Sequence, residues 1–293
     1  MDIVIDSSVC KKCNLCVEIC PNRILAKNEK GEIIALPDRT FLCFECGQCM
    51  AACSTKAIKA GSLTYEKDLF DVVQPENASD IFDKIIQSRR SVRNFKDKPV
   101  PKEILEKIVQ AISFSPPAFP PIKFSLIVVN DKELMQKALP IMVAMYDNMV
   151  KMMKKKMVRY FIKKEVGKKR FLLMDNHLVP ILESDIPLMK NSNEDTLMRH
   201  APSMILFLAD KEGEDIIADI YIATTIGTLA THAYGLGSTI TDIIPPAIQR
   251  DLELRKMFRI PDGKDVVASL IIGYPKYKYL RGIKRKIKSV EWM

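Results

Sequence analysis

The sequence predicts an α+β chain in which a small cysteine-rich domain precedes a larger domain of alternating helices and strands. All eight cysteines lie within the first 53 residues. Beyond them, apolar residues recur at helical spacing in several segments that short β-branched runs separate. Hydrophobic residues make up 47% of the 293 positions, which is enough for a buried core. We expect domains at residues 1–65 and 80–293, joined by a linker at 66–79.

The cysteines form two copies of one motif. The copies are Cys10-x-x-Cys13-x-x-Cys16-x-x-x-Cys20 and Cys43-x-x-Cys46-x-x-Cys49-x-x-x-Cys53. This is the spacing of bacterial iron–sulfur proteins, in which the fourth cysteine of each motif ligates the cluster of the other. We therefore expect a ferredoxin-like domain with two 4Fe–4S clusters. One would bind Cys10, Cys13, Cys16 and Cys53, and the other Cys43, Cys46, Cys49 and Cys20.

Zinc and disulfides are weaker interpretations of the same cysteines. A four-ligand zinc site has no use for a third cysteine at the same interval. Disulfides are typical of small secreted domains, and this chain opens without a basic stretch followed by an apolar one. Pro21 follows the first motif and Ser54 the second, but neither position is a ligand. We expect a cytoplasmic protein, because thiolate clusters suit a reducing compartment.

Positive charge is concentrated in two segments of a chain whose net charge is +9. Residues 151–170 hold ten Lys or Arg against one Glu, and residues 276–288 hold seven and no acid. The first segment is interpreted as a solvated helix face, or as a docking site for an acidic electron donor or an anionic substrate. Nucleic-acid motifs are missing, and no apolar run is long enough to span a membrane. We therefore expect neither nucleic acid nor membrane as a partner.

Capping residues and periodicity predict the first elements around and after the linker. Residues 62–65 are expected to form the last strand of the small domain. Ser79 or Asp80 can cap a helix, and a second helix begins at Pro101. A β-branched run at 124–129 predicts a strand. In the first of these helices, apolar residues recur at helical spacing, and they are Ile81, Phe82, Ile85 and Ile86.

The remaining elements follow the same logic. A methionine-rich helix is expected at 131–156, and a helix rich in small residues at 214–234 ends before Gly235. Residues 157–200 lack clear periodicity. Further strands are expected at 203–209, 238–241 and 266–272, with a helix at 246–258.

The segment Ser88-Arg89-Arg90-Ser91-Val92-Arg93-Asn94-Phe95 resembles the phosphate-binding signature R-x-S-x-R/K of the FMN-dependent nitroreductase family. A guanidinium group binds phosphate bidentately, and a serine hydroxyl adds a neutral donor. In an extended segment Arg89, Ser91 and Arg93 project together, and Arg90 projects the other way. The resemblance implies that this segment binds the FMN phosphate.

Two further segments resemble the same family. Gly273-Tyr274-Pro275, the basic tail and Trp292 are similar to its closing strand and tail, in which an arginine reaches the FMN phosphate. Arg285 is the best match, with Lys284 beside it. The segment from Gly235 to Asp242 is similar to the G-L-G strand that places backbone N–H groups beside the flavin ring. Those groups would belong to Thr241, Asp242 and Ile243.

One segment departs from the family pattern. Many members carry Asn and Gln in the loop after the second helix, whereas residues 115–123 here hold four prolines and no amide side chain. Contacts to the flavin ring would then come from backbone groups or Lys123. This departure argues against the usual nitro-compound and quinone substrates.

The resemblance implies a nitroreductase-like domain with a mainly antiparallel central sheet flanked by helices, and a homodimer with FMN at the subunit interface. We expect electrons to pass from a ferredoxin or similar one-electron donor through both clusters to FMN, which reduces or reversibly oxidises a small molecule. Two alternatives stay open. One is an electron carrier or redox sensor without turnover, and the other is a binding module with a vestigial flavin site.

Overall fold

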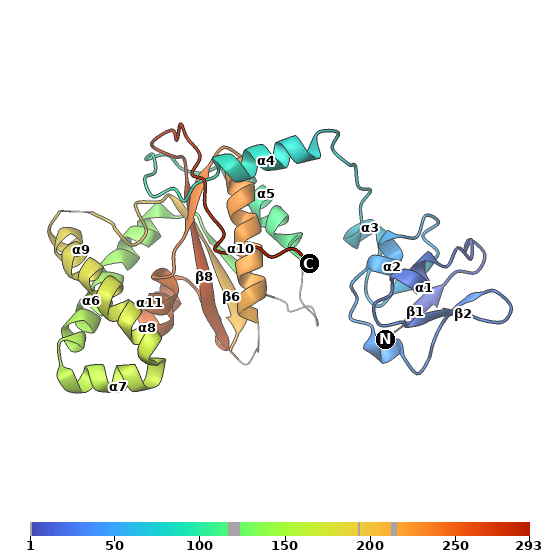
Figure 1. Cartoon of the computed structure of the whole chain (residues 1–293), viewed down its shortest axis with the longest axis horizontal. Helices are drawn as coiled ribbons and strands as arrows, with labels where there is room; N and C mark the ends of the chain where they lie inside the picture. The colour runs from blue at the N-terminus through green and yellow to red at the C-terminus, as the bar shows by residue number, and fades with distance from the viewer. Residues whose placement is uncertain (1, 117–123, 193, 212–215) are drawn as a thin grey trace. The chain divides into compact units, whose positions relative to one another are not determined.

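Two antiparallel strand pairs frame the N-terminal part of the chain in the computed structural model (Figure 1). β1 (Ile3–Ile5) pairs with β4 (Ile58–Ala60), and β2 (Leu25–Lys27) pairs with β3 (Ile33–Ala35). The helices α1 (Leu15–Ile19) and α2 (Gln48–Ala51) lie within the two cysteine motifs, and a 3₁₀ turn spans Thr40–Leu42. Leu25, Met50, Ile58 and Ala60 form the small core.

The structure describes residues 2–116, 124–192, 194–211 and 216–293. The chain divides into two units, one running to Ala78 and the other beginning at Ser79. Each unit has its own hydrophobic core. Within the described ranges, no helix has both the length and the apolar character to cross a lipid bilayer.

The strand predicted at residues 62–65 is absent, and the short helix α3 (Tyr65–Asp68) begins at its end. Thr64 caps this helix, because its hydroxyl accepts from the Lys67 N–H while its own N–H donates to the Asp68 carboxylate at 2.7 Å. The Tyr65 hydroxyl donates to the Ile58 carbonyl oxygen at 3.0 Å. Local capping therefore overrides the β-branched pattern, and Tyr65 and Leu69 pack on the core of the first unit.

A four-stranded antiparallel sheet forms the centre of the second unit and confirms the predicted sheet type. Its order is β5 (Ser125–Val129), β6 (Ser203–Asp210), β8 (Lys264–Gly273) and β7 (Gly237–Ile240). Leu206 faces one core and Phe207 the other, so β6 is buried on both faces and reads as a continuous apolar run. The register shifts where Phe207 and Leu208 pair with β8, which bends the sheet.

Helices cover both faces of this sheet. On one face lie α5 (Lys102–Ser113) and α10 (Ile216–Ala233), which pack against each other and on β7 and β8. Figure 1 shows a helical group gathered on the other side. It consists of α6 (Lys132–Met153), α7 (Lys156–Val166), α8 (Lys168–Leu173), a π turn (Met174–Leu178), α9 (Val179–Asn191), α11 (Ile244–Arg250) and α12 (Leu252–Met257).

Of two helix predictions, one needs correction. The helix α4 (Ala78–Ser88) forms as expected, and its apolar Ile81, Phe82 and Ile86 are 48%, 58% and 44% exposed. The helix predicted at 246–258 is two helices, because the Asp251 carboxylate accepts from the N–H groups of Glu253 and Leu254 and starts α12. Residues 157–200, which show no clear period, are largely helical.

Candidate cluster and flavin sites

The eight thiols gather into two groups of four. The thiols that act electrostatically on Cys16 are those of Cys10, Cys13 and Cys53. Those that act on Cys49 are Cys46, Cys20 and Cys43. Each group therefore combines three cysteines of one motif with the fourth cysteine of the other, which is the exchange that the spacing predicts.

Burial, followed by repulsion from neighbouring thiols, raises the pKa of Cys16 and raises the pKa of Cys49 to about 11. Four thiolates crowd together only when a positively charged group binds among them. Across the described residues, no three His, Cys, Asp or Glu side chains converge closely enough for a single metal ion. A group of four thiols fits a 4Fe–4S cluster, in which each iron takes its own thiolate.

The same backbone conformation recurs in the two motifs. The second residue after the first cysteine is left-handed in both, at Lys12 (φ 55°) and Glu45 (φ 55°). The residue after the second cysteine is also left-handed, at Asn14 (φ 71°) and Gly47 (φ 71°). Left-handed residues turn successive N–H groups towards one point, which makes a concave site for a negatively charged group. The loops are thus shaped for an anionic thiolate-bound cluster.

Backbone N–H groups also reach the fourth cysteine of each motif. Ile24 N–H donates to the Cys20 sulfur at 3.4 Å, and Ala57 N–H donates to the Cys53 sulfur at 3.2 Å. Burial raises the pKa of Cys53, but hydrogen bonds from Ala57 and Thr55 outweigh it and leave this pKa below its ordinary value. Hydrogen bonds to cluster sulfurs tune the reduction potential.

The candidate phosphate segment lies along the outer edge of β7. Ser91 forms a parallel bridge with Ser238, and Val92 N–H donates to the Ser238 carbonyl oxygen at 2.9 Å. Val92 is buried, whereas Ser91 and Arg93 are exposed on either side of it. Only glycine fits at position 237, because a Cβ atom there would lie 2.5 Å from the Val92 side chain. This close approach holds the segment in place.

Arg89 and Arg90 have different environments. Arg90 donates to the carbonyl oxygens of Arg89 at 2.7 Å and Arg281 at 3.1 Å, so its guanidinium anchors the C-terminal tail. The predicted phosphate role of Arg90 is therefore not supported. Arg89 is half-buried, and its charge is among the causes that lower the pKa of His232, after burial of the imidazole.

The predicted tail residues Lys284 and Arg285 are exposed in a segment without helix or strand. The bond from Arg90 to the Arg281 carbonyl places the start of this basic stretch beside the phosphate segment. Among the described residues, no carboxylate pairs with Arg89 or Arg93. This set of unpaired cationic and hydroxyl donors fits the phosphate of FMN.

The three backbone groups predicted to face the flavin ring are not equivalent. Thr241 N–H donates to the Ser269 carbonyl oxygen at 3.0 Å, so it is already engaged and does not fit the predicted role. Asp242 and Ile243 follow it at the start of α11, and no acceptor is found for their N–H groups within the described part of the chain. Lys123 and most of the proline-rich loop lie outside the described residues.

A pocket of about 630 Å³ adjoins Asp242. Within it, the Tyr221 hydroxyl of α10 donates to the Asp242 carboxylate at 3.1 Å. Burial, followed by the negative charge of Asp242, raises the pKa of Tyr221. No sequence pattern predicts this pair, because a tyrosine in a helix and an aspartate after a strand meet only in the folded sheet.

Two family models match the chain. One, described as the nitroreductase family, matches residues 86–274, and the other, described as a 4Fe-4S dicluster domain, matches residues 9–58. A protein of Methanothermobacter thermautotrophicus, named NADH dehydrogenase/NAD(P)H nitroreductase, is 26% identical over 195 residues. That alignment covers 65% of this chain and 75% of the relative.

Solved structures share the fold of the second unit. An FMN-bound nitroreductase of Bacteroides fragilis gives a TM-score of 0.53 at 17% identity and covers 72% of this chain and 97% of its own. An FMN-bound nitroreductase of Desulfitobacterium hafniense gives 0.52 at 22% identity, with 71% and 97% covered. These likenesses establish the fold.

Proposed function

Since the chain belongs to the nitroreductase family, we propose that it takes single electrons from an external low-potential donor and delivers them in pairs to a small organic substrate. It is an FMN-dependent oxidoreductase with two 4Fe–4S clusters. We infer a ferredoxin or similar one-electron carrier as the donor.

The observation that carries this proposal is the union of two four-thiol groups and a flavoprotein fold in one chain. Clusters exchange one electron at a time, whereas FMN exchanges one or two. The name of the Methanothermobacter relative gives NAD(P)H as its reductant. In this chain the cluster unit offers a one-electron input instead.

On this proposal the protein binds the FMN phosphate through Arg89, Ser91 and Arg93, with Lys284 and Arg285 of the tail as further cations. The N–H groups of Asp242 and Ile243 lie at the start of α11, where the helix dipole favours negative charge on a bound flavin ring.

Substrate reduction also needs a proton, which the Tyr221 hydroxyl can give once it turns from Asp242 to the substrate. Its raised pKa keeps the hydroxyl protonated at neutral pH. Tyr221 is itself partly exposed, so water can return the proton to it. A substrate that accepts a hydride equivalent and the Tyr221 proton gains two hydrogens in all.

We also propose a homodimer. The apolar face of α4 is exposed, and α10 exposes Ile217 and Ile222. Adjacent exposed apolar side chains on a helix mark a surface that contacts another protein chain. Sedimentation equilibrium that gives a monomer at micromolar concentration would contradict this assembly.

The competing function is an electron carrier or redox sensor without turnover. The two functions are separated by reducing the anaerobic holoprotein with reduced ferredoxin or with NADPH and following flavin absorbance. The proposal predicts fast reduction by ferredoxin and substrate-dependent reoxidation. Flavin that stays reduced across a panel of nitro, quinone and enone compounds would favour the carrier, and faster reduction by NADPH would overturn the cluster input.

A further inference from the structure

The pocket beside Asp242 is lined by side chains from distant parts of the second unit. Apolar surface comes from Ile217, Pro245 and Val266. The volume of about 630 Å³ lies within the range of small-molecule sites. Its charged and polar lining residues come from α8, α10, α11 and the ends of β6, β7 and β8. They are Arg170, Asp210, Lys211, Tyr221, Asp242, Gln249 and Asp265.

The three carboxylates of this pocket already have partners. Asp210 pairs with Lys264 at 2.9 Å, and Asp265 lies 3.7 Å from Arg255. Asp242 accepts the Tyr221 hydroxyl. By contrast, Arg170 and Lys211 form no ion pair with any residue that the structure describes. Asp242 keeps its negative charge, because the Tyr221 hydroxyl is neutral. Two cations and one carboxylate of the described lining therefore have no ion-pair partner among the described residues.

Arg170 is held at this position by its neighbours in α7 and α8. Gly167 turns the chain between the two helices with φ 83° and ψ 155°, a conformation that other residues rarely adopt. Phe171 is buried, and the Arg159 guanidinium lies 5.2 Å from its ring centroid. Burial of Phe171 therefore holds α8 in place, and the preceding residue, Arg170, lies at the pocket.

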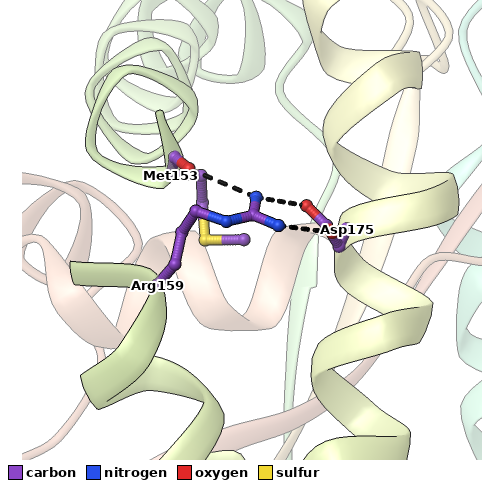
Figure 2. Close-up of polar contacts among 3 residues, drawn as sticks. All are labelled: Met153, Arg159 and Asp175. Carbon is purple, nitrogen blue, oxygen red and sulfur yellow. Dashed lines mark hydrogen bonds and ion pairs between the residues drawn. The ribbon is translucent and has the colours of Figure 1, made fainter. Parts of the chain in front are cut away.

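Arg159 does not compete for the pocket's ligand, because its own charge is satisfied. Figure 2 shows its guanidinium donating two hydrogen bonds to Asp175, at 2.5 and 2.7 Å, and a third to the Met153 carbonyl oxygen at 3.4 Å. This fork joins α7 to the π turn before α9. Within the basic segment 151–170, Arg159 therefore stabilises the packing of two helices, whereas Arg170 lines a pocket.

A second pocket leads to the same arginine. It has a volume of about 660 Å³ and is lined by Lys168, Lys169 and Arg170 among others. Arg170 lines both pockets, and Lys168 and Lys169 line the second pocket with it. Cations gathered at a pocket raise the local concentration of anions and speed their association.

We propose that Arg170 binds a carboxylate of the organic substrate in the Tyr221–Asp242 pocket, with Lys168 and Lys169 guiding the anion inward. A planar guanidinium binds a carboxylate through two parallel hydrogen bonds. The proposal rests on the proposed function and assigns its substrate class, a small carboxylic acid. It gives part of the basic segment 151–170 a role beyond solvation.

The test uses benzoate and benzamide, which share a ring and differ in charge. Calorimetric titration of the anaerobic, oxidised holoprotein is expected to detect benzoate. Arg170→Gln should weaken the binding of benzoate about 10- to 100-fold, because a charge-assisted pair is lost, and should leave the affinity for benzamide unchanged. Arg170→Lys should recover part of the affinity. Lys164→Gln is the control, because it removes the same charge from an exposed residue outside both pockets. Its affinity for benzoate should equal that of the wild type.

Several results would overturn the inference. These are wild-type protein that does not bind benzoate, equal losses for benzoate and benzamide in Arg170→Gln, or equal weakening of benzoate by Lys164→Gln. Tighter binding of phenyl phosphate than of benzoate would also overturn the carboxylate assignment. If these failures occur in protein that holds FMN and turns over methyl 4-nitrobenzoate, only this inference fails. Protein without FMN or turnover of any compound would contradict the proposed function instead.

Discussion

At the scale of single residues, Val92 determines where its neighbours point. Its side chain fills the space that Gly237 leaves free, so Ser91 and Arg93 must project outward. The alternation was predictable from the sequence, because an extended segment has a period of two. That Arg90 anchors the tail was not predictable, since its acceptor belongs to Arg281, far along the chain.

Replacing Arg89 tests the phosphate site. Arg89→Gln is expected to weaken the binding of FMN about 10- to 100-fold, because one charge-assisted phosphate contact is lost. Riboflavin, which lacks the phosphate, should bind both proteins equally. Fluorescence titration of the flavin-free protein measures both ligands. Lys96→Gln removes a nearby exposed charge and serves as the control, and equal losses for FMN and riboflavin would place Arg89 elsewhere.

His232 predicts a pH dependence of stability. Ser88 donates its hydroxyl hydrogen to the Lys84 carbonyl oxygen, so His232 Nε2–H must donate to the Ser88 oxygen at 2.7 Å. Burial and the charges of Arg89 and Arg90 lower the pKa of this histidine below 6.5. The unfolded chain then binds a proton that the folded chain resists, so the free energy of unfolding falls as pH drops below 6.5.

Urea unfolding at pH 7.5 and 5.5 checks this sign. Wild-type protein should lose more stability on acidification than His232→Gln, whose amide can still donate to Ser88 but does not titrate. Equal losses in the two proteins would show that His232 is not the group responsible.

The cysteine ligands and the Arg-x-Ser-x-Arg segment could be proposed from the sequence because each is a local pattern with a chemical meaning. Tyr221, Asp242 and Arg170 could not. They line one pocket only because α8, α10 and the end of β7 meet in space. No sequence spacing encodes that meeting, and each residue alone reads as an ordinary surface side chain.

At the scale of elements, strong periodicity predicted the strands and the long helices of the second unit. The failures have local causes. The Thr64 cap begins a helix where a strand was expected, and the Asp251 cap divides one helix into two. The apolar residues of α4 recur at helical spacing as predicted, but Ile81, Phe82 and Ile86 stay exposed among the described residues. Periodicity predicts that a helix has an apolar face and does not predict what covers that face.

The contact between β7 and the phosphate segment predicts the effect of Gly237→Ala. The new methyl group would lie 2.5 Å from Val92 and must displace the segment from β7. We expect a loss of about 1–3 kcal/mol of stability, as overpacking causes, together with weaker FMN binding. Urea unfolding and FMN titration measure the two effects.

A second substitution provides the control. Val92→Ala in the Gly237→Ala background removes the clashing methyl groups and should restore much of the FMN affinity, which is the coupling expected of touching residues. Unchanged FMN binding by Gly237→Ala would mean that the position of this segment does not matter for the flavin.

At the scale of the whole molecule, the chain separates two kinds of chemistry into units with separate cores. All eight thiols lie in the first unit, and the arginines, hydroxyls and backbone donors proposed for FMN lie in the second. Because none of the proposed cofactor ligands is shared between the units, damage to one site should leave the other able to bind its group.

Cys53→Ser tests that independence together with the exchange of fourth cysteines. Anaerobically purified wild-type protein should contain about eight irons and one FMN per chain. The variant should retain one FMN and lose about half its iron, because Cys53 groups with Cys10, Cys13 and Cys16. Cys20→Ser should remove the other cluster, and electron paramagnetic resonance of the reduced variants should then give two different spectra. With the exchange, the spectrum of Cys53→Ser should match that of Cys13→Ser, because both residues belong to one group. A match with Cys46→Ser instead would contradict the exchange, and four or fewer irons in the wild type would contradict two clusters.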